Sequence, residues 1–256
     1  MGMLESIKSG RENKPPRIMV YGQEGVGKST FGASAPAPII IQTEDGLGEI
    51  DCCKFPLAQS VGDVLDSLTA LRDEEHNFRT VVIDSLDWLE RLIFDEICKE
   101  FGVRSIEKAD GGYGKGYVDA LVHWRKVIAL LDELRNKRGM MVILLAHAKV
   151  ERFEDPENAA YDRYSPRLHK HAASLISEWV DGVFFATKRM RISKDGDSRA
   201  IAAPIGADGG ERILRTNGSP ACIAKNRYSL PSEIPLSWNA FIEAYRNSVA
   251  PAAAAS

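Results

Sequence analysis

The sequence predicts an α/β fold in which a mostly parallel central sheet is flanked by helices and extended by antiparallel strands in the C-terminal third. Through the first 150 residues, apolar runs of strand length alternate with segments of helical period, the pattern of repeated strand–helix–strand units. Beyond residue 180, short strand-like runs separated by turn residues take over, which favours antiparallel strands. The 256 residues, 44% hydrophobic and 27% charged, are enough for one such domain.

The elements of the first part follow from apolar runs and apolar spacing. Continuous apolar runs, typical of strands buried on both faces, predict strands over 17–21, 39–42, 80–84 and 140–146. Small or periodically apolar segments predict helices over 29–34, 61–74, 87–101 and 117–137. A glycine-rich stretch over 110–116 separates the last two of these helices.

The C-terminal part is expected to add strands to the sheet and to end in a helix. Short strand-like runs lie at 183–186, 189–192, 200–203, 212–216 and 221–225, and a last helix is expected at about 237–247. Composition divides the chain into a flexible N-terminal arm at 1–16, one domain at 17–248, and a disordered alanine-rich tail at 249–256.

A complete phosphate-binding loop follows the first expected strand. The residues that we expect to contact a nucleotide are Gly22, Gln23, Glu24, Gly25, Val26, Gly27, Lys28, Ser29 and Thr30. Glycines let successive backbone N–H groups turn toward the β-phosphate, and the helix start adds further donors. Lys28 would reach the β- and γ-phosphates and support catalysis, while Ser29 would bind Mg²⁺, so ATP and Mg²⁺ are the expected cofactors. The alternative, a glycine-rich turn with a solvated lysine, does not explain why Ser29 and Thr30 begin a helix.

Two acidic positions follow apolar strands. Asp84 ends one strand, and a carboxylate at the C-terminal tip of a parallel strand lies on the ligand side of the sheet. We expect Asp84 to hold Mg²⁺ together with Ser29; the alternative is a cap on the next helix. Glu44 follows another strand and is the expected general base, with Asp45 as its rival and a solvated turn as the alternative.

His147 ends the expected strand at 140–146. A polar side chain at this tip would face the γ-phosphate and report its loss, which makes His147 a candidate sensor. The alternative is a strand-end histidine bonded to a backbone carbonyl. The sequence leaves both interpretations open.

The order of these motifs resembles that of the RecA-like ATPases. The stretch 80–86 is similar to their metal-binding strand and 41–47 to their catalytic-glutamate strand, within a resemblance that covers about 17–245. RecA itself carries Gln at the position of His147. The resemblance implies a RecA-like P-loop core that hydrolyses ATP.

The stretch 224–228 resembles the Lys-x-Arg element of the hexameric-helicase and RadA branches, in which two cations reach the γ-phosphate of a neighbouring subunit. The resemblance gives this role to Lys225 and Arg227, which share one face of a strand, and implies a homo-oligomer, either filament or ring. The chain as a whole is similar to phage-encoded RecA-like ATPases, some of which are classed as single-strand annealing or recombination proteins. Single-stranded DNA and a single-stranded DNA-binding protein are therefore the implied partners.

In RecA-like filaments two loops line the DNA axis, and the equivalent segments here are 105–117 and 149–171. Cations and aromatics in such loops suit backbone tracking and base stacking. The candidate DNA-binding residues are Lys108, Tyr113, Lys115, Arg152, Arg163 and Arg167. The alternative is that both segments are ordinary mobile loops.

Composition bears on the expected location of the protein, and several functions compete as hypotheses. The net charge of −3 gives no overall basic signature of a nucleic-acid binder. No apolar run is long enough to span a membrane, so we expect a cytoplasmic location, in the host cell if the protein is encoded by a phage. The leading hypothesis is a DNA-stimulated ATPase that promotes strand annealing or recombination. The alternatives are a RecA-like helicase or motor, a nucleotide-gated scaffold, and a small-molecule kinase.

Overall fold

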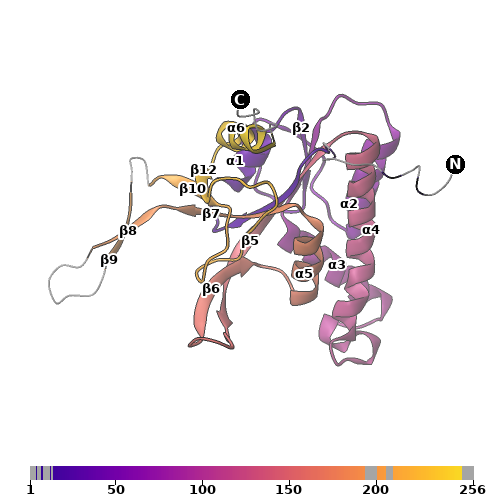
Figure 1. Cartoon of the computed structure of the whole chain (residues 1–256). Helices are drawn as coiled ribbons and strands as arrows, with labels where there is room; N and C mark the ends of the chain where they lie inside the picture. The colour runs from indigo at the N-terminus through magenta and orange to yellow at the C-terminus, as the bar shows by residue number, and fades with distance from the viewer. Residues whose placement is uncertain are drawn as a thin grey trace.

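The centre of the molecule is a sheet whose largest part is parallel. The computed structural model describes residues 14–193, 201–205 and 210–249, together with Leu4, Ile7 and Glu12. The parallel strands are β1 (Arg17–Gly22), β2 (Pro38–Gln42), β3 (Cys53–Lys54), β4 (Thr80–Asp84), β5 (Met141–Phe153) and β7 (Gly182–Lys188). They lie side by side in the order β7-β1-β5-β4-β2-β3 (Figure 1). β5 therefore separates the strand that leads into the phosphate loop from the strand that ends in Asp84.

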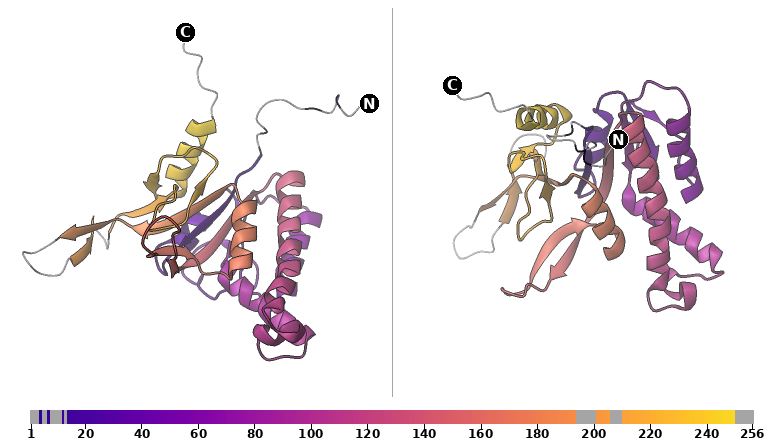
Figure 2. Two further views of the ribbon diagram at one scale, coloured as in Figure 1. Left: turned by 60° about the horizontal axis from the view of Figure 1, so that its bottom comes forward. Right: turned by 45° about the vertical axis from the view of Figure 1, so that its right-hand side comes forward.

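Antiparallel strands extend this sheet at two places. β10 (Arg212–Arg215), β11 (Lys225–Asn226) and β12 (Glu233–Pro235) continue it beyond β7, and β6 (Tyr161–Pro166) pairs with the second half of β5. β8 (Met190–Ser193) and β9 (Ile201–Pro204) form a separate two-stranded sheet that projects from the body (Figure 2). The predicted α/β class, with a mostly parallel sheet and antiparallel strands in the C-terminal third, is confirmed.

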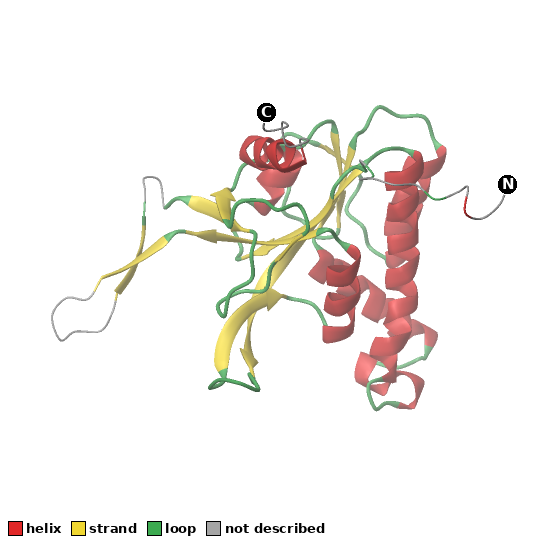
Figure 3. Ribbon diagram, viewed as in Figure 1, coloured by secondary structure: helices red, strands yellow, loops and turns green. Residues whose placement is uncertain are grey.

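Helices cover both faces of the sheet (Figures 1 and 3). The first face carries α1 (Lys28–Ala33) and α6 (Trp238–Val249); the second carries α2 (Val61–Asp73), α3 (Leu86–Glu100), α4 (Lys115–Lys137) and α5 (Lys170–Trp179). Because side chains alternate along a strand, β1 serves both cores. Ile18 and Val20 pack in the core with Phe31 and Phe241, whereas Met19 belongs to the core under the four helices.

The long α4 shows why these segments form covering helices. Its buried residues recur every three or four positions, which places them on one face: Gly116, Ala120, Trp124, Val127, Leu131 and Leu134. A short 3-10 helix, η2 (Ile106–Gly111), precedes it. A Cβ at Gly116 would lie 2.4 Å from the carbonyl oxygen of Ile106, so only glycine allows η2 and α4 to approach this closely. Among the described residues, none of the helices combines the length and the apolar character needed to cross a bilayer.

One prediction about the chain course needs correction. The stretch 149–171 was expected to be a loop, but it holds the second half of β5, the whole of β6 and the start of α5. Its residues alternate between exposed and partly buried positions along the hairpin, and charged side chains occupy both sets of positions, which hides the strand pattern. Of the expected arm at 1–16, only Leu4, Ile7, Glu12 and 14–16 are among the described residues, and the expected tail at 249–256 lies outside them beyond Val249, the last residue of α6.

Candidate nucleotide site

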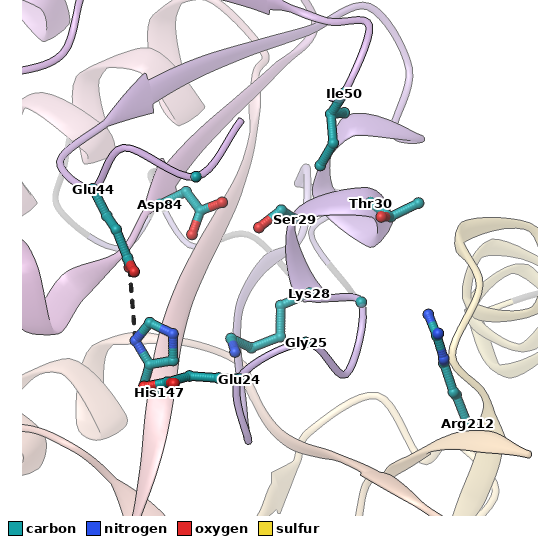
Figure 4. Close-up of a pocket in the computed structure, with 12 residues that line it drawn as sticks. Glu24, Gly25, Lys28, Ser29, Thr30, Glu44, Ile50, Asp84, His147 and Arg212 are labelled. Carbon is teal, nitrogen blue, oxygen red and sulfur yellow. Dashed lines mark ion pairs between the residues drawn. The ribbon is translucent and has the colours of Figure 1, made fainter. Parts of the chain in front are cut away.

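Strand register brings the predicted site residues to one edge of the sheet. Gly22 of β1 is level with His147 of β5, and Asp84 of β4 is level with Gln42 of β2. Since all four strands run parallel, the segments that leave their carboxyl ends meet at this edge. Together they line a cavity of about 390 Å³ (Figure 4), whose residues are Glu24, Gly25, Gly27, Lys28, Ser29, Thr30, Glu44, Gly46, Ile50, Asp84, His147 and Arg212.

The phosphate loop has the backbone that its glycines predict. Gly27 has a φ of +107°, in the region that favours glycine, and it is the residue from which α1 starts. Lys28 is buried, and its Nζ donates to the carbonyl oxygens of Gly22 at 3.1 Å and Gln23 at 3.0 Å. Burial lowers the pKa of Lys28, and the nearby carboxylates of Asp84 and others oppose that shift. The loop thus presents one buried cation surrounded by acids.

Asp84 and Ser29, the two predicted metal ligands, both line the cavity. Asp84 is buried at the tip of β4, and the Ser29 side chain hydrogen-bonds to its carboxylate. Burial raises the pKa of Asp84, whereas Ser29 and Lys28 act to lower it. A carboxylate and a hydroxyl are oxygen donors of the kind that Mg²⁺ takes alongside substrate phosphates. Among the described residues, no three His, Cys, Asp or Glu side chains are grouped so that they could hold a metal ion.

Glu44 points into the cavity, whereas its rival does not line it. The Ser85 hydroxyl donates to Glu44 Oε2 at 3.2 Å. Thr43 ties the same segment to the end of β4, because its Oγ1 donates to the Ser85 carbonyl oxygen at 2.6 Å and accepts from the Ser85 N–H at 2.9 Å. Asp45 is exposed outside the cavity. The geometry therefore favours Glu44 over Asp45 as the residue that faces a bound phosphate.

His147 is held by a carboxylate and not by a backbone carbonyl. Its backbone N–H donates to Asp87 Oδ1 at 3.0 Å, and its Nδ1 lies 3.1 Å from Asp87 Oδ2. The same Nδ1 lies 3.8 Å from Glu44 Oε2, the contact dashed in Figure 4. His147 thus stands between the candidate base and a buried aspartate.

Asp87 and Arg167 are site residues that the sequence did not reveal. Arg167 Nη2 and Nε lie 2.7 Å and 3.1 Å from Asp87 Oδ2, and Arg167 Nη1 lies 3.4 Å from Glu24 of the phosphate loop. Burial alone would raise the pKa of Asp87, but hydrogen bonds from His147 and Arg167 more than offset it and hold that pKa well below its usual value. Arg167 was a candidate DNA contact; the structure places its guanidinium at the nucleotide site. No local motif marks a pair separated by 80 positions.

Lys225 and Arg227 lie away from this cavity, at the opposite edge of the sheet. Lys225 pairs with Val183 at the start of β7, and its Nζ donates to three carbonyl oxygens at the end of α5, those of Ser177 (2.6 Å), Glu178 (3.0 Å) and Val180 (2.7 Å). The Arg227 side chain is 56% exposed and lies 3.6 Å from Asp181 Oδ1. Lys225 is therefore engaged within its own chain, and Arg227 is the member of the pair that a neighbouring subunit can reach.

The DNA-binding candidates fall on two protrusions. Tyr113 is fully exposed between η2 and α4, flanked by exposed Lys108 and by Lys115, which lies 3.5 Å from Asp110. On the β5–β6 hairpin, Arg152 is exposed between acidic neighbours. Arg163 pairs with Glu151 at 3.0 Å and stacks 3.9 Å from the centre of the Phe153 ring.

The fold and the site together define a P-loop nucleotide-binding domain of the ATPase type. Residues 14–228 match the family described as an AAA domain, and since this is most of the chain, the protein belongs to that family. A comparison with curated proteins gave no match. Membership in this family indicates that the ligand is ATP, which such domains usually bind together with Mg²⁺. The phosphate loop and the adjacent Ser29 and Asp84 side chains agree with this.

Proposed function

We propose that this protein is a Mg²⁺-dependent ATP hydrolase. The observation that carries the proposal is the convergence of Lys28, Ser29, Asp84 and Glu44 on one cavity beside the phosphate loop. These four side chains supply a cation for the phosphates, two oxygen ligands for a metal, and a carboxylate for water activation. Bound Mg²⁺ would neutralise charge on the β- and γ-phosphates.

Each residue has a defined task in this hydrolysis. The Lys28 ammonium would exchange its two loop carbonyls for phosphate oxygens when ATP binds. Glu44, held by the Ser85 hydroxyl, would orient a water and accept its proton as that water's oxygen bonds to the γ-phosphorus. The bond from the γ-phosphorus to the β,γ-bridging oxygen breaks, which leaves ADP and phosphate. His147 stands next to Glu44 and is placed to respond to the loss of the γ-phosphate.

We further propose that turnover is linked to single-stranded DNA, in an annealing or recombination protein of the phage RecA-like type. Support comes from β5, because one continuous strand carries His147 at the nucleotide site and Arg152 on the projecting hairpin. A second support is the exposed Tyr113, a side chain free to stack on an unpaired base. Arg227, exposed at the far edge, supports a homo-oligomer in which one subunit reaches the nucleotide of the next.

The test is the rate of ATP hydrolysis with and without single-stranded DNA, with negative-stain imaging of the same samples. DNA-stimulated turnover together with filaments on DNA is the expected result. Rings that unwind duplex DNA would replace the annealing role by a helicase role. Phosphorylation of a small molecule without any DNA effect would replace both roles by a kinase. Binding of ATP without turnover would leave a nucleotide-gated scaffold.

A further inference from the structure

A second cavity, of about 180 Å³, adjoins the phosphate loop on the side away from Glu44. It is lined by Gly27, Thr30, Phe31, Ser34, Arg212, Leu236, Ser237, Trp238 and Asn239. Gly27, Thr30 and Arg212 also line the first cavity, so the two cavities adjoin. The phosphate loop therefore has a cavity on each of its two sides.

The direction of a bound triphosphate follows from the residues on each side. Glu44 and His147 lie on one side of the loop in Figure 4, and Arg212 lies on the other. Because Glu44 and the metal pair act on the β,γ end, that end points toward His147. The α-phosphate and the nucleoside must then lead toward Arg212 and into the second cavity.

Arg212 is an exposed residue at the start of β10, and the surroundings of its charge differ from those of the arginines near it. Arg189, between β7 and β8, lies 3.0 Å from the Glu233 carboxylate, and Arg215, on the same strand as Arg212, lies 3.3 Å from it. The Arg212 guanidinium, in contrast, has no hydrogen-bond or ion-pair partner within the part of the chain that the structure describes. It lies against the loop, where a Cβ on Gly27 would come within 3.0 Å of its Nη1. A planar, weakly hydrated cation in this position is suited to stack on a flat ring.

The second cavity has the composition of a site for a flat heterocycle. Phe31, Leu236 and Trp238 form its apolar wall, with the Phe31 and Trp238 rings 5.6 Å apart. The exposed Asn239 adds an amide that offers both donors and an acceptor. An apolar lining with a few polar groups is typical of small-ligand sites.

We propose that this cavity binds the nucleobase and that Arg212 stacks on the base and closes the cavity against the phosphate cleft. The proposal rests on the proposed ATP site and adds a specificity residue from β10, a strand remote in sequence from the phosphate loop. Arg212 would then act on the nucleoside and leave the phosphates to the loop. Ligands that lack a base would not depend on it.

The test compares Mg·ATP with Mg·tripolyphosphate, which carries three phosphates and no base, by isothermal titration calorimetry. Arg212→Ala should weaken ATP binding about fivefold or more, since stacking contributes ~1–3 kcal/mol, and should change tripolyphosphate binding less than about twofold. Asn239→Trp, which fills the cavity from an exposed helical position, should show the same selective loss. Arg125→Ala, at an exposed arginine of α4, is the control and should match wild type for both ligands.

Equal weakening of both ligands by Arg212→Ala would make Arg212 a phosphate contact and overturn the proposal. Unchanged ATP binding in both Arg212→Ala and Asn239→Trp would overturn it as well. A wild-type protein that binds neither ligand would remove the proposed function itself, an outcome separate from the selective loss tested here.

Discussion

Arg167 holds Asp87 with two guanidinium nitrogens, Nη2 at 2.7 Å and Nε at 3.1 Å from a single carboxylate oxygen. Asp87 is buried, and its other contacts are to His147. Arg167 follows β6 directly, so this pair fastens the return of the β5–β6 hairpin to the nucleotide site. A structural change at the hairpin can therefore alter the nucleotide site through this ion pair, and the reverse also holds.

The first prediction concerns the charge of Asp87. Asp87→Asn should lower the free energy of unfolding at pH 7 by on the order of 1–3 kcal/mol, because it removes the nearest carboxylate from Arg167, which keeps only Glu24 at 3.4 Å and some access to water. The folded-state pKa of Asp87 lies below its unfolded value, so its stabilisation is present above the unfolded pKa and is lost as pH falls toward the folded one. The measurement is urea unfolding of wild type and variant.

The difference between wild type and Asp87→Asn should therefore shrink between about pH 5 and pH 2. Asp95→Asn, at an exposed aspartate of the same helix, serves as the matched control and should have little effect at any pH. A difference for Asp87→Asn that stays constant over this range would contradict the assigned ion pair.

The second prediction concerns Glu90, whose buried carboxylate accepts the His169 N–H at 3.0 Å and 2.9 Å. Burial raises the pKa of Glu90 from 4.5 to about 7. Between these values the unfolded chain loses its proton while the folded chain keeps it, so Glu90 destabilises the fold as pH rises, fully above about pH 7. Glu90→Gln should thus stabilise the protein at pH 8 by on the order of 1–3 kcal/mol and bring little gain at pH 5. Equal effects at both pH values would count against this assignment.

The sequence was sufficient to predict the phosphate loop and to place Asp84, Glu44 and His147 at one edge of the sheet, because those positions depend on a local motif and on the rule that parallel strands share one edge. The expectation that His147 ends its strand was wrong, since β5 continues to Phe153. It was also sufficient for the sheet class and most helices, since buried strands and amphipathic helices have periodic patterns. It was not sufficient for Arg167 or Arg212. Arg212 lies on β10 and Arg167 directly follows β6, so the positions of both depend on long-range strand pairing, and neither lies in a recognisable pattern.

Lys225 shows how a motif can be ambiguous. In sequence, Lys225 and Arg227 form one pair with one expected role. In the structure, Lys225 caps the carbonyls at the end of α5, whereas Arg227 is exposed. The spacing predicted that both residues lie on one face of a strand, but it could not show which of them binds the carbonyl oxygens at the end of a helix.

The third prediction separates these two residues. Lys225→Ala should lower the melting temperature, because it leaves three carbonyl oxygens without their common donor, whereas Arg227→Ala should leave it nearly unchanged. Arg227→Ala should instead reduce ATP turnover, and mixing it with Lys28→Ala protein should restore part of the activity at mixed interfaces. If proven co-assemblies show no restoration at any mixing ratio, Arg227 does not act across subunits.

The fourth prediction concerns the exposed tip before α4. Tyr113→Ala combined with Lys115→Ala should weaken binding of single-stranded DNA and remove DNA stimulation, while basal ATP hydrolysis survives, because the tip lies outside the nucleotide cavity. Fluorescence anisotropy with a labelled oligonucleotide measures the first effect, and circular dichroism checks the fold. DNA binding equal to wild type would make this tip a connector only.

The most direct measurement is steady-state ATP turnover by wild type and Glu44→Gln in the presence and absence of Mg²⁺, with ATP affinity measured on the same preparations. We expect Mg²⁺-dependent turnover in wild type, a loss of roughly 10²-fold or more in Glu44→Gln with ATP binding retained, and loss of binding or turnover in Lys28→Ala. Turnover that is unchanged in Glu44→Gln, or that survives Lys28→Ala, would contradict the assignment of this cavity as the site of hydrolysis.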